Sequence, residues 1–117
     1  MLKEEIAKNF KYRIGHNVFT IPSVMLIKNQ NGTFSINQLE TRRIHDIIVR
    51  EICDNADPLD WHHFTFLYQV TKTRLRKLVK DFEISRATLL FWRNSKFIDG
   101  EMSKSLKQYF FQKAYRN

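Results

Sequence analysis

The chain has 117 residues, of which 43% are hydrophobic and 14% aromatic, a composition that excludes intrinsic disorder and is typical of one compact unit or two tightly packed small lobes. Its net charge of +8 lies entirely in residues 72–117, which hold twelve basic and four acidic residues, because the two signs cancel in residues 1–71. An excess confined to one half favours a polyanionic partner over a generally basic surface.

The first third of the chain predicts a short helix and then a small antiparallel β piece. Residues 1–17 are polar and irregular, and the one regular element expected there is a helix over residues 2–10. Residues 18–36 contain β-prone apolar runs that are interrupted at Pro22. Asn31-Gly32 is a typical hairpin signal because both residue types tolerate positive φ. Two or three antiparallel strands are therefore expected.

Two helices are predicted next. Asn37 and Glu40 have the spacing of a capping box, and apolar residues recur on one helical face from there to about Cys53. These apolar residues are Leu39, Ile44, Ile47, Ile48 and Ile52. Asp57 and Pro58 have the residue types of an N-cap and a first helical position, so a second helix is expected from Pro58 to about residue 70. Its inward positions are Trp61, Phe64, Leu67 and Tyr68.

Residues 71–95 predict two short helices joined by a tight turn. Thr73 is expected to cap the first helix, whose apolar positions are Leu75, Leu78, Val79 and Phe82. The turn falls at Glu83-Ile84, and Ser85 is expected to cap a second helix with Leu89 and Trp92 on its inner face. Two such helices that meet at an angle leave the outer face of the second free to enter a major groove about 12 Å wide. The segment is interpreted as a helix-turn-helix that binds duplex DNA.

Within this segment, Ile84-Ser-Arg-Ala-Thr-Leu resembles the Cro/C1/Xre class of repressors, which typically read Val-Ser-Arg-Ala-Thr-Val. Trp92 and Asn94 stand where that class has a Trp or Tyr and then the Asn of Asn-Gly. Three positions depart from the class: its turn glycine is Glu83, its polar residue opening the first helix is Leu75, and its glycine after Asn94 is Ser95. The resemblance covers residues 71–95 and implies a lambda-repressor-like helix-turn-helix bundle, which makes the expected fold mostly α with a small N-terminal antiparallel β piece.

The wider layout is similar to that of MqsA-type antitoxins, in which an N-terminal zinc-binding lobe contacts a toxin and a C-terminal domain dimerises on an operator. The paired cysteines of that lobe are absent here, so apolar packing would have to hold it together. The resemblance implies a dimerisation or protein-partner lobe over residues 1–56 and a DNA-binding domain over residues 57–117.

The match to the repressor class implies which side chains face DNA. A recognition helix from Ser85 to about Asn94 would direct five residues toward DNA: Ser85, Arg86, Ala87, Leu90 and Arg93. Arg86 suits a bidentate contact to guanine, worth about 1–3 kcal/mol of discrimination, or a contact to phosphate, and both interpretations stay open. Ala87 and Leu90 either touch thymine methyl groups or are surface residues without a role. Five further residues suit the phosphate backbone, unless they form a solvated face: Thr73, Arg74, Lys77, Asn94 and Lys96.

A last helix is expected after Asp99, which has the residue type of an N-cap. Its apolar row closes the core or forms a dimer seam: Met102, Leu106, Tyr109 and Phe110. Phe111 and Tyr115 exceed what a small core needs, which favours burial against a partner. Repressors of this class usually act as dimers on palindromic sites, because one module covers only a half-site.

Catalysis, a bound metal and a cofactor are not expected. His62 and His63 would point about 100° apart on a helix, which makes them a poor metal pair. Three glycines leave no phosphate-binding loop, and the single cysteine, Cys53, excludes a disulfide and a CxxC site. Neither a signal-peptide pattern nor an apolar run of roughly 18 residues is present, so a cytoplasmic protein without membrane contact is expected.

Three functions are compatible with these observations. The first is a sequence-specific transcriptional regulator that represses by binding an operator as a dimer. The second is an antitoxin-like protein that binds a toxin through its N-terminal lobe and regulates its own operon. The third is an RNA-binding or nucleoid-type protein that uses the basic half without sequence preference.

Overall fold

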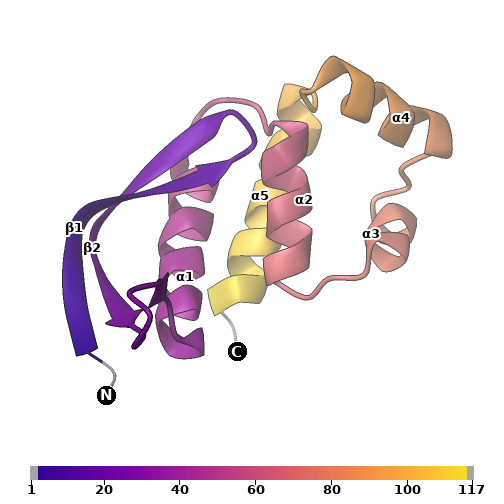
Figure 1. Cartoon of the computed structure of the whole chain (residues 1–117). Coiled ribbons are helices and arrows are strands. Elements are labelled where there is room, and N and C mark those ends of the chain that lie inside the picture. The colour runs from indigo at the N-terminus through magenta and orange to yellow at the C-terminus, as the bar shows by residue number, and fades with distance from the viewer. Residues whose placement is uncertain (1–2, 116–117) are drawn as a thin grey trace. The chain divides into compact units, whose positions relative to one another are not determined.

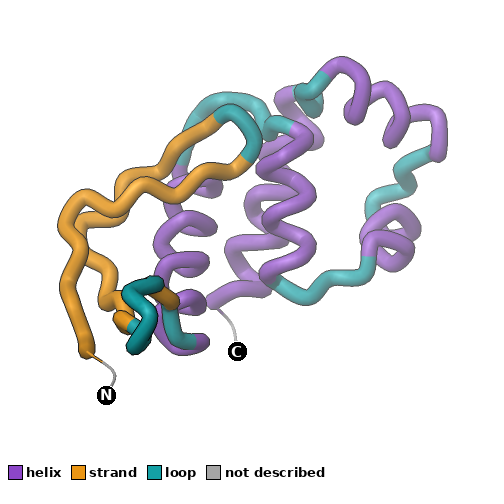
Figure 2. Tube along the Cα trace, viewed as in Figure 1, coloured by secondary structure: helices purple, strands orange, loops and turns teal. Residues whose placement is uncertain are grey.

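A computed structural model describes residues 3–115, which form an N-terminal antiparallel sheet followed by five α-helices (Figure 1). The elements in chain order are β1 (Lys3–Ile14), β2 (Asn17–Lys28), β3 (Phe34–Ser35), α1 (Gln38–Asp54), α2 (Trp61–Val70), α3 (Leu75–Asp81), α4 (Arg86–Ser95) and α5 (Gly100–Tyr115). Figure 2 shows that all strands precede all helices. The expected combination of a small N-terminal antiparallel sheet and a helical remainder is therefore confirmed.

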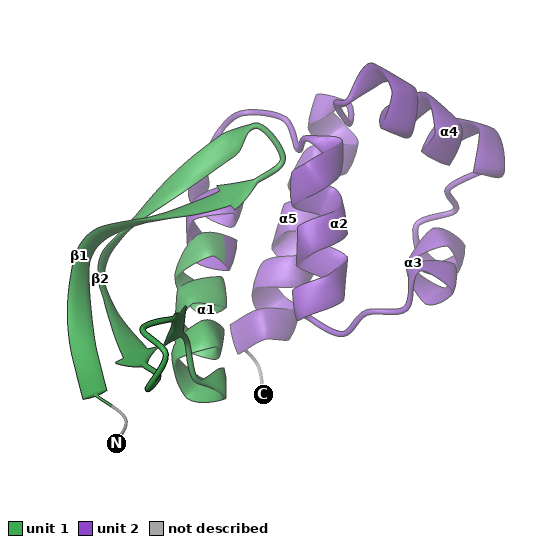
Figure 3. Ribbon diagram, viewed as in Figure 1, with its two compact units in different colours: residues 1–48 green, residues 49–117 purple. Residues whose placement is uncertain are grey.

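The chain divides into two compact units, one that ends at Ile48 and one that begins at Val49 (Figure 3). The division falls within α1, whereas the sequence placed a boundary between residues 56 and 57. The first unit holds the sheet and most of α1. The second holds the last turns of α1 and the helices α2 to α5.

β1 and β2 pair from Lys3 opposite Lys28 to Ile14 opposite Asn17, with one break. Gly15 adopts φ +61 in the connection, a conformation that costs glycine little. The helix predicted over residues 2–10 is wrong for the described residues, because residues 3–10 belong to β1; residue 2 lies outside them. Long-range pairing with β2 outweighs the local preference there.

Pro22 lies inside β2 without ending it. The pairing skips Pro22 and the residue opposite, Asn9, while the register on either side continues from Phe10–Ile21 to Lys8–Ser23. Asn9 adopts φ +53 at this point. Proline has no N–H to donate to the ladder, so the two strands accommodate it by a local break in pairing.

β3 pairs only with Ile27 and Lys28 at the end of β2. The hairpin predicted at Asn31-Gly32 is confirmed: Asn29 N–H donates to Thr33 O at 2.8 Å and Gly32 has φ +86. The resulting strand order is β1-β2-β3, so β1 is an edge strand of the sheet.

α1 begins as predicted, with the Asn37 side chain accepting a hydrogen bond from Glu40 N–H at 2.8 Å. The buried apolar residues of the first unit come from both strands and from α1: Ile14, Phe19, Ile21, Val24, Ile44 and Ile48. Leu39 was predicted to face inward, but its side chain is 76% exposed. It precedes Ile44 by five positions, which is roughly 140° around a helix and therefore a different face.

α2 starts at Trp61 with Asp60 as N-cap, not at Pro58 with Asp57 as N-cap as predicted. The Asp60 side chain accepts a hydrogen bond from His62 N–H at 2.5 Å. The preceding residue, Leu59, is held outside the helix because its N–H donates to Ser103 Oγ at 2.9 Å and its carbonyl accepts from Ile98 N–H at 2.8 Å. Tertiary hydrogen bonds thus decide which of two aspartates caps the helix.

The core of the second unit is centred on Phe64, which is fully buried in α2. Its ring lies 5.4 to 6.3 Å from four other aromatic rings, those of Trp61, Tyr68, Trp92 and Phe110. Leu67, Leu78 and Leu106 are fully buried as well. α4 and α5 are thereby packed against α2 through large side chains.

Candidate nucleic-acid interface

α3 and α4 are joined by a turn of four residues, 82–85. Phe82 N–H donates to Leu78 O at 3.0 Å and Ile84 N–H donates to Val79 O at 2.9 Å, so the turn is bonded to the end of α3. Glu83 adopts φ +53 between them, which is the left-handed region that favours glycine. Ile84 is buried, as expected of a residue between two helices.

The first turn of α4 has the cap predicted for it. Ser85 Oγ accepts a hydrogen bond from Thr88 N–H at 3.0 Å, and Ser85 adopts the extended conformation of an N-cap. Ser85 and Thr88 also hydrogen-bond through their hydroxyl groups at 2.8 Å. The start of α4 is therefore fixed by local side-chain chemistry.

The far end of α4 is fixed by tertiary contacts. Trp92 is 2% exposed, and its ring meets that of Phe64 at 75°. Lys96 ends the helix in the left-handed conformation, with its N–H donating to Trp92 O at 2.9 Å and its carbonyl accepting from Trp61 N–H at 2.7 Å. One side of α4 is thus held by the core, and the opposite side is left to solvent.

The structure places nine of the ten residues predicted to bind DNA at the surface of α3, α4 and the residues that flank them. These nine are Arg74, Lys77, Ser85, Arg86, Ala87, Leu90, Arg93, Asn94 and Lys96. Within α4, the exposed residues include Arg86, Leu90 and Arg93, which are spaced by four and three positions and so share a face of the helix. Leu90 is half exposed.

Thr73 is the exception, because it is buried, and the prediction that it caps α3 is wrong. Its side chain is 6% exposed, and its hydroxyl lies 2.8 Å from that of Thr71, which itself donates to Leu67 O. It also does not cap α3, whose N-cap is Arg74 without a side-chain hydrogen bond. Thr73 therefore belongs to the connection between α2 and α3 and offers almost no surface to a ligand.

Sequence matching missed other exposed residues of this region. Lys72, Arg76 and Lys80 are exposed, which brings the basic residues at the surface of residues 72–96 to eight against two acidic ones. A count of charges in the segment finds them without any family comparison. Phe91 and Phe97 are 67% and 58% exposed, and no signal in the sequence distinguishes them from core aromatics.

Burial shifts the pKa of several titratable groups in the second unit. Burial raises the pKa of the Cys53 thiol to about 11, so this thiol stays protonated at neutral pH. Burial lowers the pKa of His63, which keeps that imidazole neutral. Across residues 3–115, no group of three His, Cys, Asp or Glu side chains is placed to hold a metal ion. None of the helices in this part of the chain is both long enough and apolar enough to cross a membrane.

Residues 72–96 thus combine a short helix held by the core with an exposed basic surface. A comparison of the chain with protein families, curated proteins and solved structures finds no match. What the protein does is therefore inferred from its own residues.

Proposed function

We propose that the protein is a sequence-specific DNA-binding transcriptional regulator, a repressor that binds an operator as a dimer, with α3, the turn and α4 acting as a helix-turn-helix. The observation that carries this proposal is the arrangement of α4: Trp92 is buried, while Arg86, Leu90 and Arg93 are exposed on a different face of the helix. A major groove admits one α-helix, and such a helix reads bases with side chains that project from its solvent face.

The charges support DNA as the ligand. Arg86 is the first residue of α4 and Arg93 lies in its last turn, and either can make paired hydrogen bonds to guanine O6 and N7. The exposed basic residues outside α4, among them Arg74, Lys77 and Lys96, suit phosphate contacts that orient the helix on the duplex. Ala87 and Leu90 are exposed and would meet the methyl group of thymine, which is an apolar group in the major groove.

The resemblance to Cro/C1/Xre repressors adds the expected lambda-repressor-like arrangement. In that class the turn has a glycine where this chain has Glu83, and Glu83 adopts the backbone conformation that glycine favours. Glutamate in place of glycine therefore raises the conformational energy of the turn without changing its backbone conformation. The capping by Ser85 and the burial of Ile84 and Trp92 agree with the same pattern.

Selection of bound duplexes from a random library, followed by titration at two salt concentrations, tests the proposal. We expect the selected duplex to bind at least about 10³-fold more tightly than a scrambled one. Arg86→Ala should weaken binding to the selected duplex by roughly ten- to a hundredfold and binding to the scrambled duplex far less. Arg76→Ala, on the exposed surface of α3, is the matched control and should affect both duplexes alike.

Equal affinity for every duplex, with a steep dependence on salt, would refute sequence-specific binding and favour the nucleoid-type function. A uniform loss for Arg86→Ala across sequences would reassign Arg86 from the bases to the backbone.

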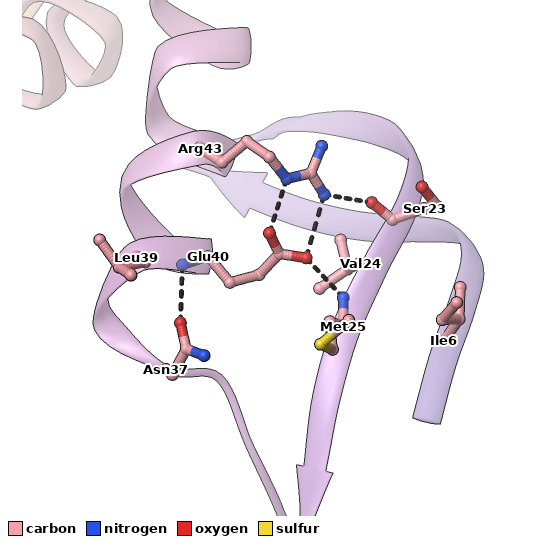
Figure 4. A pocket seen from close by; sticks show the side chains of 8 residues that line it. All are labelled: Ile6, Ser23, Val24, Met25, Asn37, Leu39, Glu40 and Arg43. Carbon is pink, nitrogen blue, oxygen red and sulfur yellow. Dashed lines mark hydrogen bonds and ion pairs between the residues drawn. The ribbon is translucent and has the colours of Figure 1, made fainter. Parts of the chain in front are cut away.

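The antitoxin-like alternative is favoured by one feature of the first unit. A pocket of about 420 Å³ lies between the start of α1 and β2, and its apolar lining includes Val24, Met25 and Leu39 (Figure 4). Leu39 is the most exposed of these side chains. If a toxin binds here, Leu39→Lys should abolish its co-purification from the native host and leave DNA binding unchanged; a toxin retained by this variant would refute the pocket as its site.

A further inference from the structure

Within residues 3–115, the outer edge of β1 pairs with no other strand of the sheet. β1 is twelve residues long and lies at the edge of the sheet. An edge strand presents backbone N–H and C=O groups to solvent, and proteins that have no use for such an edge shorten it, cover it, or place charges or bulges along it.

The opposite edge of the same sheet, formed by β2, is covered. β3 pairs with the end of β2, and further back along β2 two side chains of α1 take the place of a strand. Glu40 accepts a hydrogen bond from Met25 N–H and Arg43 donates one to Ser23 O, both at 2.5 Å, while the two side chains form an ion pair at 2.6 Å (Figure 4). Within the described residues, no side chain is hydrogen-bonded in this way to the outer edge of β1 over residues 3–8.

The hydrogen bond of Met25 also shows which groups of β1 point outward. In an antiparallel ladder, the N–H and C=O of one residue point to the same side, and the side alternates along the strand. Met25 N–H points away from β1, toward Glu40, so its partner Ile6 directs its own N–H and C=O away from β2. Glu4 and Lys8, two residues to either side, direct theirs to the same open edge.

We propose that a second copy of this chain binds along this edge, with β1 of each copy antiparallel to the other and Ile6 on the twofold axis. Glu4 of each copy then stands opposite Lys8 of the other. The interface is isologous, as in most homodimers. It involves the first unit alone and does not rest on DNA binding.

The register follows from direction and charge. Residues whose backbone N–H and C=O point to the open edge must pair with residues of the same kind in the other copy. A symmetric register whose twofold axis passes between two residues would pair each of them with a residue of the other kind, and such registers are excluded. A centre at Glu5 or at Lys8 would place like charges directly opposite each other, which destabilises a sheet. A centre at Ala7 would place Ile6 opposite Lys8 and Lys3 opposite Lys11. The centre at Ile6 pairs opposite charges on both sides of the axis.

Burial of apolar surface supports the same register. Ile6 is 65% exposed and its cross-strand neighbour Met25 is 38% exposed. Paired residues share one face of a sheet, so the dimer would join Met25 and Ile6 of one copy to Ile6 and Met25 of the other in a continuous apolar row. The Glu4–Lys8 pairs border this row. Asn9, with its positive φ and broken pairing, marks the end of the regular segment.

Sedimentation equilibrium on the full chain without DNA tests the interface. We expect a monomer–dimer equilibrium for the unaltered protein. Ile6→Lys places two like charges on the axis and should raise the dimer dissociation constant by at least about tenfold. Val18→Lys is the matched control, because Val18 is also an exposed apolar strand residue, at 49%, but lies in β2 beyond the proposed contact. Circular dichroism establishes that each variant is folded.

Charge exchange tests the register itself. Glu4→Lys alone and Lys8→Glu alone should each weaken the dimer, because each places like charges opposite one another at two symmetric positions. A mixture of the two single variants should restore dimers as heterodimers, since both pairs then carry opposite charges. The double variant E4K/K8E should restore the homodimer.

A protein that stays monomeric at the highest concentration it tolerates would overturn the proposal. So would a dimer that Ile6→Lys leaves unchanged while Phe111→Lys breaks it, because that result would move the interface to α5. Failure of charge exchange to restore association would overturn the register. A dimer that passes these tests yet binds no DNA would leave this inference standing and refute the proposed function.

Discussion

Replacement of Trp92 by alanine should unfold the second unit far more readily than replacement of the residue before it. Trp92 is 2% exposed and stacks edge-on against Phe64, at a centroid distance of 6.0 Å. A buried tryptophan removes about 200–250 Å² from water, which at ~25 cal/mol per Å² is about 5–6 kcal/mol as an upper bound. Because part of that area is already buried in the unfolded chain, we expect a loss of about 3–5 kcal/mol.

Phe91 is the internal control for this experiment. It is also aromatic and occupies the same helix, but it is 67% exposed. Since only a third of its surface is buried and alanine is the better helix former, Phe91→Ala should cost about 1 kcal/mol or less. Urea unfolding followed by far-UV circular dichroism measures both values. Equal losses for the two variants, or a larger loss for Phe91→Ala, would show that the faces of α4 are assigned wrongly, and the DNA-binding proposal would fail with them.

Three further changes have defined outcomes. Glu83→Gly should raise the free energy of unfolding by about 0.5–1 kcal/mol, because glycine relieves the cost of φ +53; a destabilised variant would contradict the left-handed turn. Lys107→Met should lower the free energy of unfolding by about 1–3 kcal/mol, because the ammonium group donates to Asn55 O and Asp57 O and both carbonyls would lose their donor. Lys104 is exposed on the same helix, so Lys104→Met should change the free energy of unfolding by less than about 0.5 kcal/mol. Glu40→Gln should cost about 1 kcal/mol at pH 7, measured by urea unfolding. The hydrogen bonds from Arg43 and Met25 N–H lower the pKa of the Glu40 carboxyl from 4.5 to about 2, so its contribution is complete above pH 4.5 and lost as pH falls to about 2, where the two proteins should become equally stable.

Several features that depend on neighbouring residues in the chain were predicted correctly. Asn37, Ser85 and Asp99 each accept a hydrogen bond from the N–H three residues later, which is a local interaction. The turn at Asn31-Gly32 is equally local, because it depends on backbone conformations that few residues tolerate.

Features that depend on distant residues were missed. β1 forms because residues 17–28 pair with it, and no pattern within residues 3–14 alone predicts that pairing. Thr73 looked like a surface cap, but it is buried beside Thr71, and its N–H donates to Tyr68 O at 2.8 Å. In both cases the deciding contact follows from the folded arrangement and leaves no pattern in the local sequence.

The candidate DNA-binding surface was largely predictable because Trp92 sets the orientation of α4. Once that side chain is buried, helical geometry places Arg86 and Leu90 about 120° and 160° away from it, toward solvent. The exposure of Phe91 was not evident, because it lies only about 100° from Trp92 and its environment depends on how far the core extends around the helix.

The two proposed interfaces differ in charge, and this difference yields opposite expectations for salt. The edge segment 3–8 carries two basic and two acidic residues and so has no net charge, whereas residues 72–96 carry eight basic and two acidic residues. Two copies of the second segment would repel each other, but DNA phosphates would release counterions on binding it.

An increase from about 50 to 200 mM salt should therefore weaken DNA binding by roughly 10³-fold or more if six phosphates are contacted. The dimer should change far less, because its apolar row is insensitive to salt and its two exposed Glu4–Lys8 pairs, each worth at most about 1 kcal/mol, together account for at most about 30-fold. A dimer as salt-sensitive as the DNA complex would show that the copies associate through charge, and pairing around Ile6 would be excluded.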